Sequence, residues 1–135
     1  MPTPFFSQPA TGSSVTISGI PTGSTDLVID LVGVSHNRNT TATLRMAVSA
    51  DGVSWSAPSA VAAFNKAWPY IGHIVLAGYE GDLGVASRIQ PDNMALSLAA
   101  FVTDFGWVCP GGVQHVKLSW SAGSFDAGTI NATVR

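Results

Sequence analysis

The last part of the chain, residues 113–135, alternates between apolar and polar residues in two short runs separated by a turn-like segment. The first run holds Val116, Leu118 and Trp120 at every second position, and the second holds Ile130, Ala132 and Val134. Glycine, serine and aspartate fill the segment between the runs. Successive side chains of a strand point to opposite faces, so this alternation predicts two strands that each bury one face. We expect an antiparallel hairpin here, with the final strand fixed in a sheet.

Similar short runs recur along the rest of the chain and predict further strands. They are 14–18, 26–34, 42–49, 53–56, 70–79 and 85–89. Turn-forming residues separate them at the spacing typical of a sandwich or barrel. The sequence therefore predicts an all-β fold: an antiparallel, jelly-roll-like β-sandwich of about eight strands. We expect one domain over 14–135, preceded by an extended arm over 1–13.

Three segments are harder to assign from their residues. Asp51 and Gly52 indicate a tight turn that joins 42–49 to 53–56. Residues 57–69 fit a loop or a short helical turn, and residues 104–112 fit a loop. Residues 92–102 fit either a strand or a helix capped at Asp92, and their β neighbours favour the strand.

The chain carries unusually little charge for a soluble domain. Charged residues make up 10% of it, against about 25% in typical soluble proteins. This deficit predicts a homo-oligomer, or a surface covered by a partner. The alternative is a monomer whose surface is coated with serine, threonine and glycine. The net charge of -2, with no basic cluster, argues against nucleic acid as a partner.

The remaining bulk features concern location and covalent chemistry. Cys109 is the only cysteine, so an intrachain disulfide is impossible. The N-terminal residues lack a signal-peptide pattern, and no apolar run is long enough for a membrane span. We therefore expect no membrane insertion and an assembly route in the cytoplasm. Phe5 and Phe6 in the arm would be costly to leave in water, so we expect them to dock on this subunit or a neighbouring one.

The sequence offers little that points to catalysis, a metal or a cofactor. Cys109, His115 and Asp104 can be drawn as a triad, but their spacing matches no known signature. His36 and His73 lie on separate elements without paired metal-ligand spacing. We expect no enzyme activity, no metal and no cofactor, and a small hydrolase remains the third alternative.

Aromatic residues in loops are the better candidates for function. Aromatic faces stack on sugar rings, and neighbouring polar side chains bind the hydroxyl groups. We expect a glycan site formed by the loops 35–41, 64–70 and 104–110. The candidate residues are Trp68, Tyr70, Trp107, His36, Asn37 and Arg38. The alternative is that the loop tryptophans close the end of the sandwich.

Two stretches carry a resemblance to a known group of proteins. The run 18–29 resembles the opening of small tailed-phage and prophage virion proteins, including those of gene transfer agents. Asn37, Arg38 and Thr40 follow in the same order, and the stretch 123–130 resembles the recurrent finish of those proteins. The resemblance implies a jelly-roll-like fibre, spike or tail component of a virion, and it transfers no catalytic residue.

The resemblance also implies partners for the chain. We expect a homo-oligomer, a trimer or pentamer, that assembles with other virion proteins and contacts host-surface polysaccharide. The alternative function is a stand-alone carbohydrate-binding module or lectin.

Overall fold

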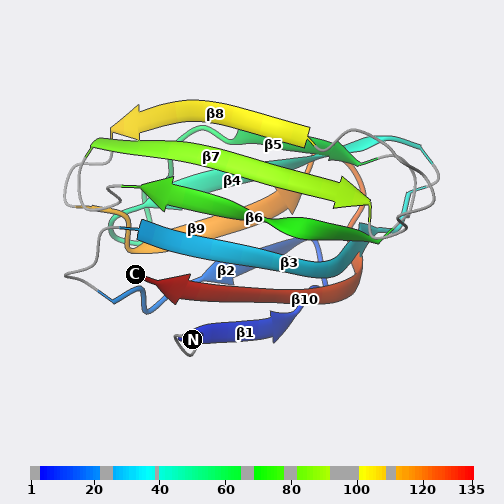
Figure 1. Cartoon of the computed structure of the whole chain (residues 1–135), viewed down its shortest axis with the longest axis horizontal. Coiled ribbons are helices and arrows are strands. Elements are labelled where there is room, and N and C mark those ends of the chain that lie inside the picture. Colours follow the sequence, from blue (N-terminus) through cyan, green and yellow to red (C-terminus); the bar gives the residue numbers. More distant parts are fainter. Residues whose placement is uncertain are drawn as a thin grey trace.

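The computed structural model describes residues 4–21, 26–38, 40–64, 69–77, 82–91, 101–108 and 112–135. Within them, ten strands form two antiparallel sheets that lie face to face (Figure 1). The strands are β1 (Phe6–Pro9), β2 (Ser14–Ile17), β3 (Asp26–His36), β4 (Ala42–Ser49), β5 (Ser59–Phe64), β6 (Tyr70–Ala77), β7 (Asp82–Pro91), β8 (Phe101–Val108), β9 (His115–Trp120) and β10 (Phe125–Val134). This arrangement confirms the predicted antiparallel β-sandwich. No helix long and apolar enough to cross a membrane occurs in these ranges.

The two sheets differ in size. One has six strands in the order β1-β10-β3-β6-β7-β8 and stands in front in Figure 1. The other has four strands in the order β2-β9-β4-β5 and lies behind it. All strand pairs are antiparallel.

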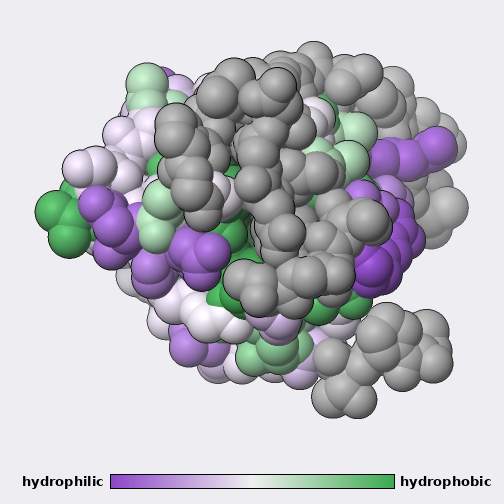
Figure 2. Space-filling view, turned by 90° about the vertical axis from the view of Figure 1, so that its left-hand side faces the viewer, coloured by the Kyte–Doolittle hydropathy of each residue, from purple (hydrophilic) through white to green (hydrophobic). Residues whose placement is uncertain are grey.

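The core fills the space between the sheets because the strands alternate as the sequence predicts. Leu27, Ile29 and Leu31 of β3 are buried, and so are Val116 and Leu118 of β9. Burying side chains of this size stabilises the fold by about 1.5–3 kcal/mol each. Figure 2 looks at the end of the sandwich that lies on the left in Figure 1, and it shows hydrophobic residues in the middle of this end with hydrophilic ones beside them.

The predicted hairpin at the end of the chain is wrong in its pairing. β9 and β10 are both strands, but β9 pairs with β2 and β4, whereas β10 pairs with β1 and β3. The segment between them crosses from the four-stranded sheet to the six-stranded sheet. Alternation shows only that each strand buries one face. Two strands in facing sheets show this pattern just as two paired strands of one sheet do.

The strand that pairs with β4 comes later than predicted. Residues 53–56 form no strand, with a bend at 53–54, and β5 (Ser59–Phe64) lies in the segment predicted as a loop or helical turn. The carboxylate of Asp51 accepts hydrogen bonds from the backbone N–H groups of Val53 and Ser54, at 2.8 Å each. These bonds fold the chain into a wide turn, so pairing with β4 starts only after it.

A second correction concerns residues 104–112, which were predicted as a loop. The structure continues β8 through Val108, in register with β7. Residues 92–100 lie outside the described residues. Of the segment 92–102, which was predicted as a strand or a helix, only residues 101 and 102 are described, and both lie in β8.

The N-terminal arm forms the edge of the six-stranded sheet. β1 pairs with β10, and the Phe5 N–H donates to the Ala132 carbonyl at 3.0 Å. Phe5 and Phe6 are half-buried and pack against the core of their own subunit. Their apolar surface is thus covered in part without a neighbouring chain.

Candidate ligand-binding surface

A crease in the six-stranded sheet shapes its outer face. The β10–β3 register shifts between Ala127 and Thr129, and the β3–β6 register shifts between Leu31 and Val34. Gly128, at the first shift, has a φ of 101°, and a Cβ there would lie 2.6 Å from the Gly33 backbone. Backbones this close exclude any side chain, so the bend depends on glycine.

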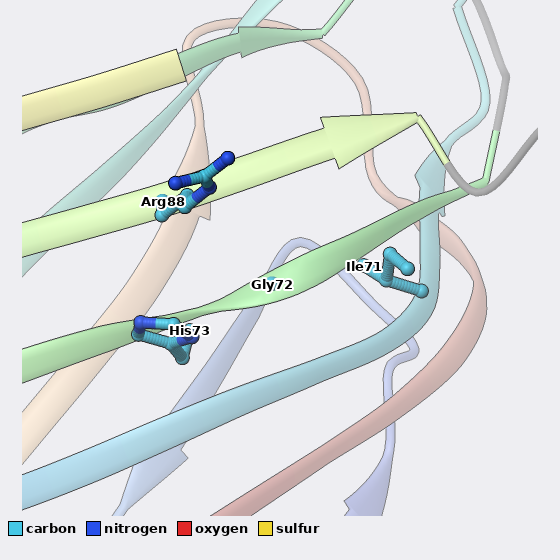
Figure 3. Close-up of a pocket in the computed structure, with 4 residues that line it drawn as sticks. All are labelled: Ile71, Gly72, His73 and Arg88. Atoms are coloured by element: carbon cyan, nitrogen blue, oxygen red, sulfur yellow. The ribbon is translucent and has the colours of Figure 1, made fainter. Parts of the chain in front are cut away.

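The same level of the sheet holds Gly72 on β6. A Cβ at this position would lie 2.2 Å from the carbonyl oxygen of Arg88 on β7. A shallow hollow of about 190 Å³ opens beside it, lined by Ile71, Gly72, His73 and Arg88. Figure 3 shows Ile71 and His73 on β6 and Arg88 on β7 around this glycine. The close strand approach therefore places three side chains around one depression.

A row of polar residues crosses the sheet through this hollow. Asn131 on β10 lies opposite Asp30 on β3, Asp30 lies opposite His73, and His73 lies opposite Arg88. Residues directly opposite each other in an antiparallel pair have Cβ atoms about 4.5–5.5 Å apart. His73 and Arg88 are exposed, and Asp30 and Asn131 are half-exposed.

The row combines complementary hydrogen-bonding groups. A guanidinium offers only donors, a carboxylate offers acceptors, and an amide and an imidazole offer both. Apolar surface lies beside them, because Val32 is 51% exposed on β3 and Ile71 is half-exposed on β6. Such a surface can bind a small polar molecule that also has an apolar face.

Two of the residues predicted to bind glycan lie in the core instead. His36 and Tyr70 are both 0% exposed. The His36 ring packs edge-on against Trp120, with centroids 5.0 Å apart, and its Nδ1 accepts the Arg38 N–H at 3.1 Å. Beyond the crease β3 is covered on both faces, since Ser35 beside His36 is also buried. Neither side chain is available to a ligand on the surface.

Asn37 and Arg38 are exposed at the turn after β3. The Asn37 side-chain oxygen accepts the N–H of Ser124 at 3.0 Å, and the Asn37 N–H donates to the Ser124 carbonyl at 3.1 Å. Asn37 therefore ties this turn to the crossover between β9 and β10. Its binding role, like that of Arg38, stays a prediction.

The described parts of the three loops predicted to form one site do not lie together. Tyr70 pairs with Val34, so the described residues 35–38 and 69–70 lie at one end of the sandwich. β8 ends at Val108, opposite Asp82, at the other end (Figure 1). Trp107 lies in β8 opposite Leu83, and Trp68 and Cys109 lie outside the described residues.

Sequence reasoning did not select His73 and Arg88 as binding residues. Alternation within 70–79 places His73 on the face opposite Ile74, but it cannot reveal that Arg88 lies across from it. In the part of the chain that the structure describes, no group of three His, Cys, Asp or Glu residues is placed to hold a metal ion.

No protein-family model and no curated protein matches the chain in sequence. The solved structure of the galectin LEC-6 from Caenorhabditis elegans is similar to this chain at a TM-score of 0.52 and 12% identity, over 94% of this chain and 95% of that one. CG-16, a homodimeric agglutinin from chicken liver, is similar at a TM-score of 0.41 and 8% identity, over 89% and 99%. The first of these shows that the chain has a galectin-like β-sandwich fold.

Proposed function

We propose that this chain is a carbohydrate-binding domain whose ligand lies on the outer face of the six-stranded sheet. The observation that carries the proposal is the hollow beside Gly72, lined by His73 and Arg88 and crossed by a polar row. The similarity in fold to a galectin supports it. We propose binding without catalysis.

Each group in the row has a role that its chemistry suits. Arg88 donates hydrogen bonds to sugar oxygens, Asp30 accepts them from hydroxyl groups, and His73 lies between the two. Ile71 contacts the apolar face of the sugar ring. The hollow is smaller than the roughly 300–1,000 Å³ of typical small-molecule pockets, so it suits a single sugar ring better than a long polymer.

Binding to a glycan array, followed by titration calorimetry on the best glycan, tests this proposal. A hydrogen bond to a charged group contributes about 1.5–3 kcal/mol, so Arg88→Ala is expected to weaken binding at least about tenfold. His73→Ala is expected to weaken it as well. Arg135→Ala removes an exposed arginine outside the hollow and serves as the matched control. Unchanged affinity in Arg88→Ala and His73→Ala, or no glycan bound at all, would contradict the proposal.

We further propose that the domain works as an oligomeric component of a virion. The low charge and the resemblance over 18–29 and 123–130 support this proposal. Light scattering coupled to size exclusion gives the mass in solution. A trimer or pentamer is expected, and a monomer at high concentration would oppose the oligomeric part of the proposal while leaving the carbohydrate-binding part standing.

A further inference from the structure

The outer face of the four-stranded sheet carries a cluster of an aromatic ring and basic groups. The Lys117 Nζ lies 4.2 Å from the centre of the Trp55 ring, a cation–π contact. The His115 ring packs edge-on against the same indole at 6.3 Å. Ser18 Oγ and His115 Nδ1 are joined by a hydrogen bond of 2.9 Å. The ammonium, the imidazole and the indole therefore hold one another in place.

A tightly bonded turn fixes Trp55 over this face. The Ser49 hydroxyl oxygen accepts the N–H of Gly52 at 2.8 Å, and the Asp51 carboxylate accepts the next two N–H groups. The turn lies against β9, since a Cβ on Gly52 would be 3.1 Å from the His115 ring. Ala47, which faces outward opposite Lys117, is only 6% exposed. Trp55 thus stands on a preorganised support.

A second cation lies on the same face. Arg45 on β4 is exposed and lies opposite Ser119, two residues along β9 from Lys117. Within the described residues, the ion pair that forms joins Arg135 to Asp26, away from both cations. The Asp51 carboxylate is occupied by the backbone of its own turn. Lys117 and Arg45 therefore form no ion pair with the described carboxylates, and their positive charges face the solvent side of this sheet.

Small hydroxyl side chains form the floor between these groups. Ser119 lies opposite Arg45 and two residues along β9 from Lys117, and Ser14 and Thr16 lie opposite Ser119 and Lys117 on β2. A floor of this kind offers donors and acceptors for hydroxyl groups without blocking approach to the cations. Two cations are too few for the phosphate backbone of a nucleic acid, which needs a clustered basic surface.

We propose that this surface is a second binding site, for an acidic saccharide unit that carries a carboxylate. The carboxylate pairs with Lys117 and Arg45, the hydroxyl groups meet Ser119 and Thr16, and the ring contacts the exposed part of Trp55. The site lies on the opposite side of the sandwich from the hollow at Gly72, so it stands or falls independently of the function proposed above.

Calorimetry with the full chain tests this site. The probe is an oligomer of galacturonic acid, and a neutral galactose oligomer of the same length is its control. Lys117→Met keeps most of the side-chain stem but removes the charge, and it is expected to weaken uronate binding at least about tenfold. Arg45→Gln is expected to weaken it less, and raised salt is expected to weaken it in the unmodified chain.

Arg135→Gln is the matched control, because it removes one positive charge at an exposed position outside both proposed sites. Uronate binding that survives Arg135→Gln and is lost in Lys117→Met supports the site. Equal losses in the two variants, or equal affinity for the neutral oligomer, would overturn it. Binding of a poly-glutamate peptide as tight as that of the uronate would overturn it in favour of an acidic peptide. Trp55→Ala removes the ring that the sugar is proposed to contact, and Trp55→Phe keeps an aromatic ring in case the alanine variant fails to fold. Trp55→Phe is expected to retain part of the affinity for the uronate.

Discussion

The two outer faces of this sandwich differ although the two inner faces are built alike. The inner faces follow one rule, apolar at every second position, and they fill one core. The outer face of the six-stranded sheet is creased and carries both signs of charge, with Asp30 beside His73 and Arg88. The outer face of the four-stranded sheet lies under a turn that holds Trp55 beside Lys117. The fold thus depends on the inner faces, and we propose that the two outer faces bind different ligands.

The largest effect is expected from breaking the crease. Gly72→Ala places a Cβ 2.2 Å from the carbonyl oxygen of Arg88, so one strand must shift. We expect a loss of about 3 kcal/mol or more in the free energy of unfolding, measured by urea denaturation. Gly84→Ala in β7 is the control, because nothing lies within 4 Å of a Cβ there, and it should stay within about 0.5 kcal/mol of the unmodified chain. Equal stability of the two variants would refute the role of the close approach.

A smaller effect is expected at the Trp55 cluster. Trp55→Ala and Lys117→Ala, alone and combined, form a double-mutant cycle that isolates their interaction. A cation–π contact at a partly exposed site contributes about 0.5–1 kcal/mol, so the coupling energy should fall in that range. Arg88→Ala on the other face should change stability by less than about 0.5 kcal/mol. A coupling energy of zero would mean that the ring does not fix the ammonium.

The smallest effect is a pH dependence at the turn that carries Trp55. Backbone N–H groups of Ser54 and Val53 donate to the Asp51 carboxylate and lower its pKa from the usual value of 3.8. A carboxyl whose pKa is lower in the folded state stabilises the fold above the unfolded pKa, and this contribution disappears as pH falls through the folded pKa. Asp51→Ala should therefore cost more stability at pH 7 than at pH 3 in urea unfolding. A difference that stays constant between the two pH values would show that ionisation plays no part.

The sequence predicted the inner faces of the sandwich better than it predicted the pairing of the strands. Alternation placed Val116 and Ile130 correctly in the core, because burial on one face is a local property of a strand. It did not show that β9 and β10 lie in different sheets, since pairing depends on residues far away in the chain. The predicted position of β5 failed because hydrogen bonds to Asp51 lengthened the turn before it.

The candidate sites were less accessible to prediction than the fold. His36 looked like a loop residue, but β3 is buried on both faces beyond the crease, and the His36 ring packs on Trp120. His73 and Arg88 are separated in sequence and meet only through the register of β6 and β7. Functional side chains that are brought together by register leave no short motif in the sequence.

The central claim is that the ligand lies on the outer face of the six-stranded sheet, and NMR mapping of the bound glycan tests it most directly. Titration with the best glycan from the array should shift the backbone amide signals of Asp30, Gly72, His73 and Arg88. Shifts confined to Asn37, Arg38 and the adjoining Ser124 would place the ligand at the loop end of the sandwich and contradict the claim.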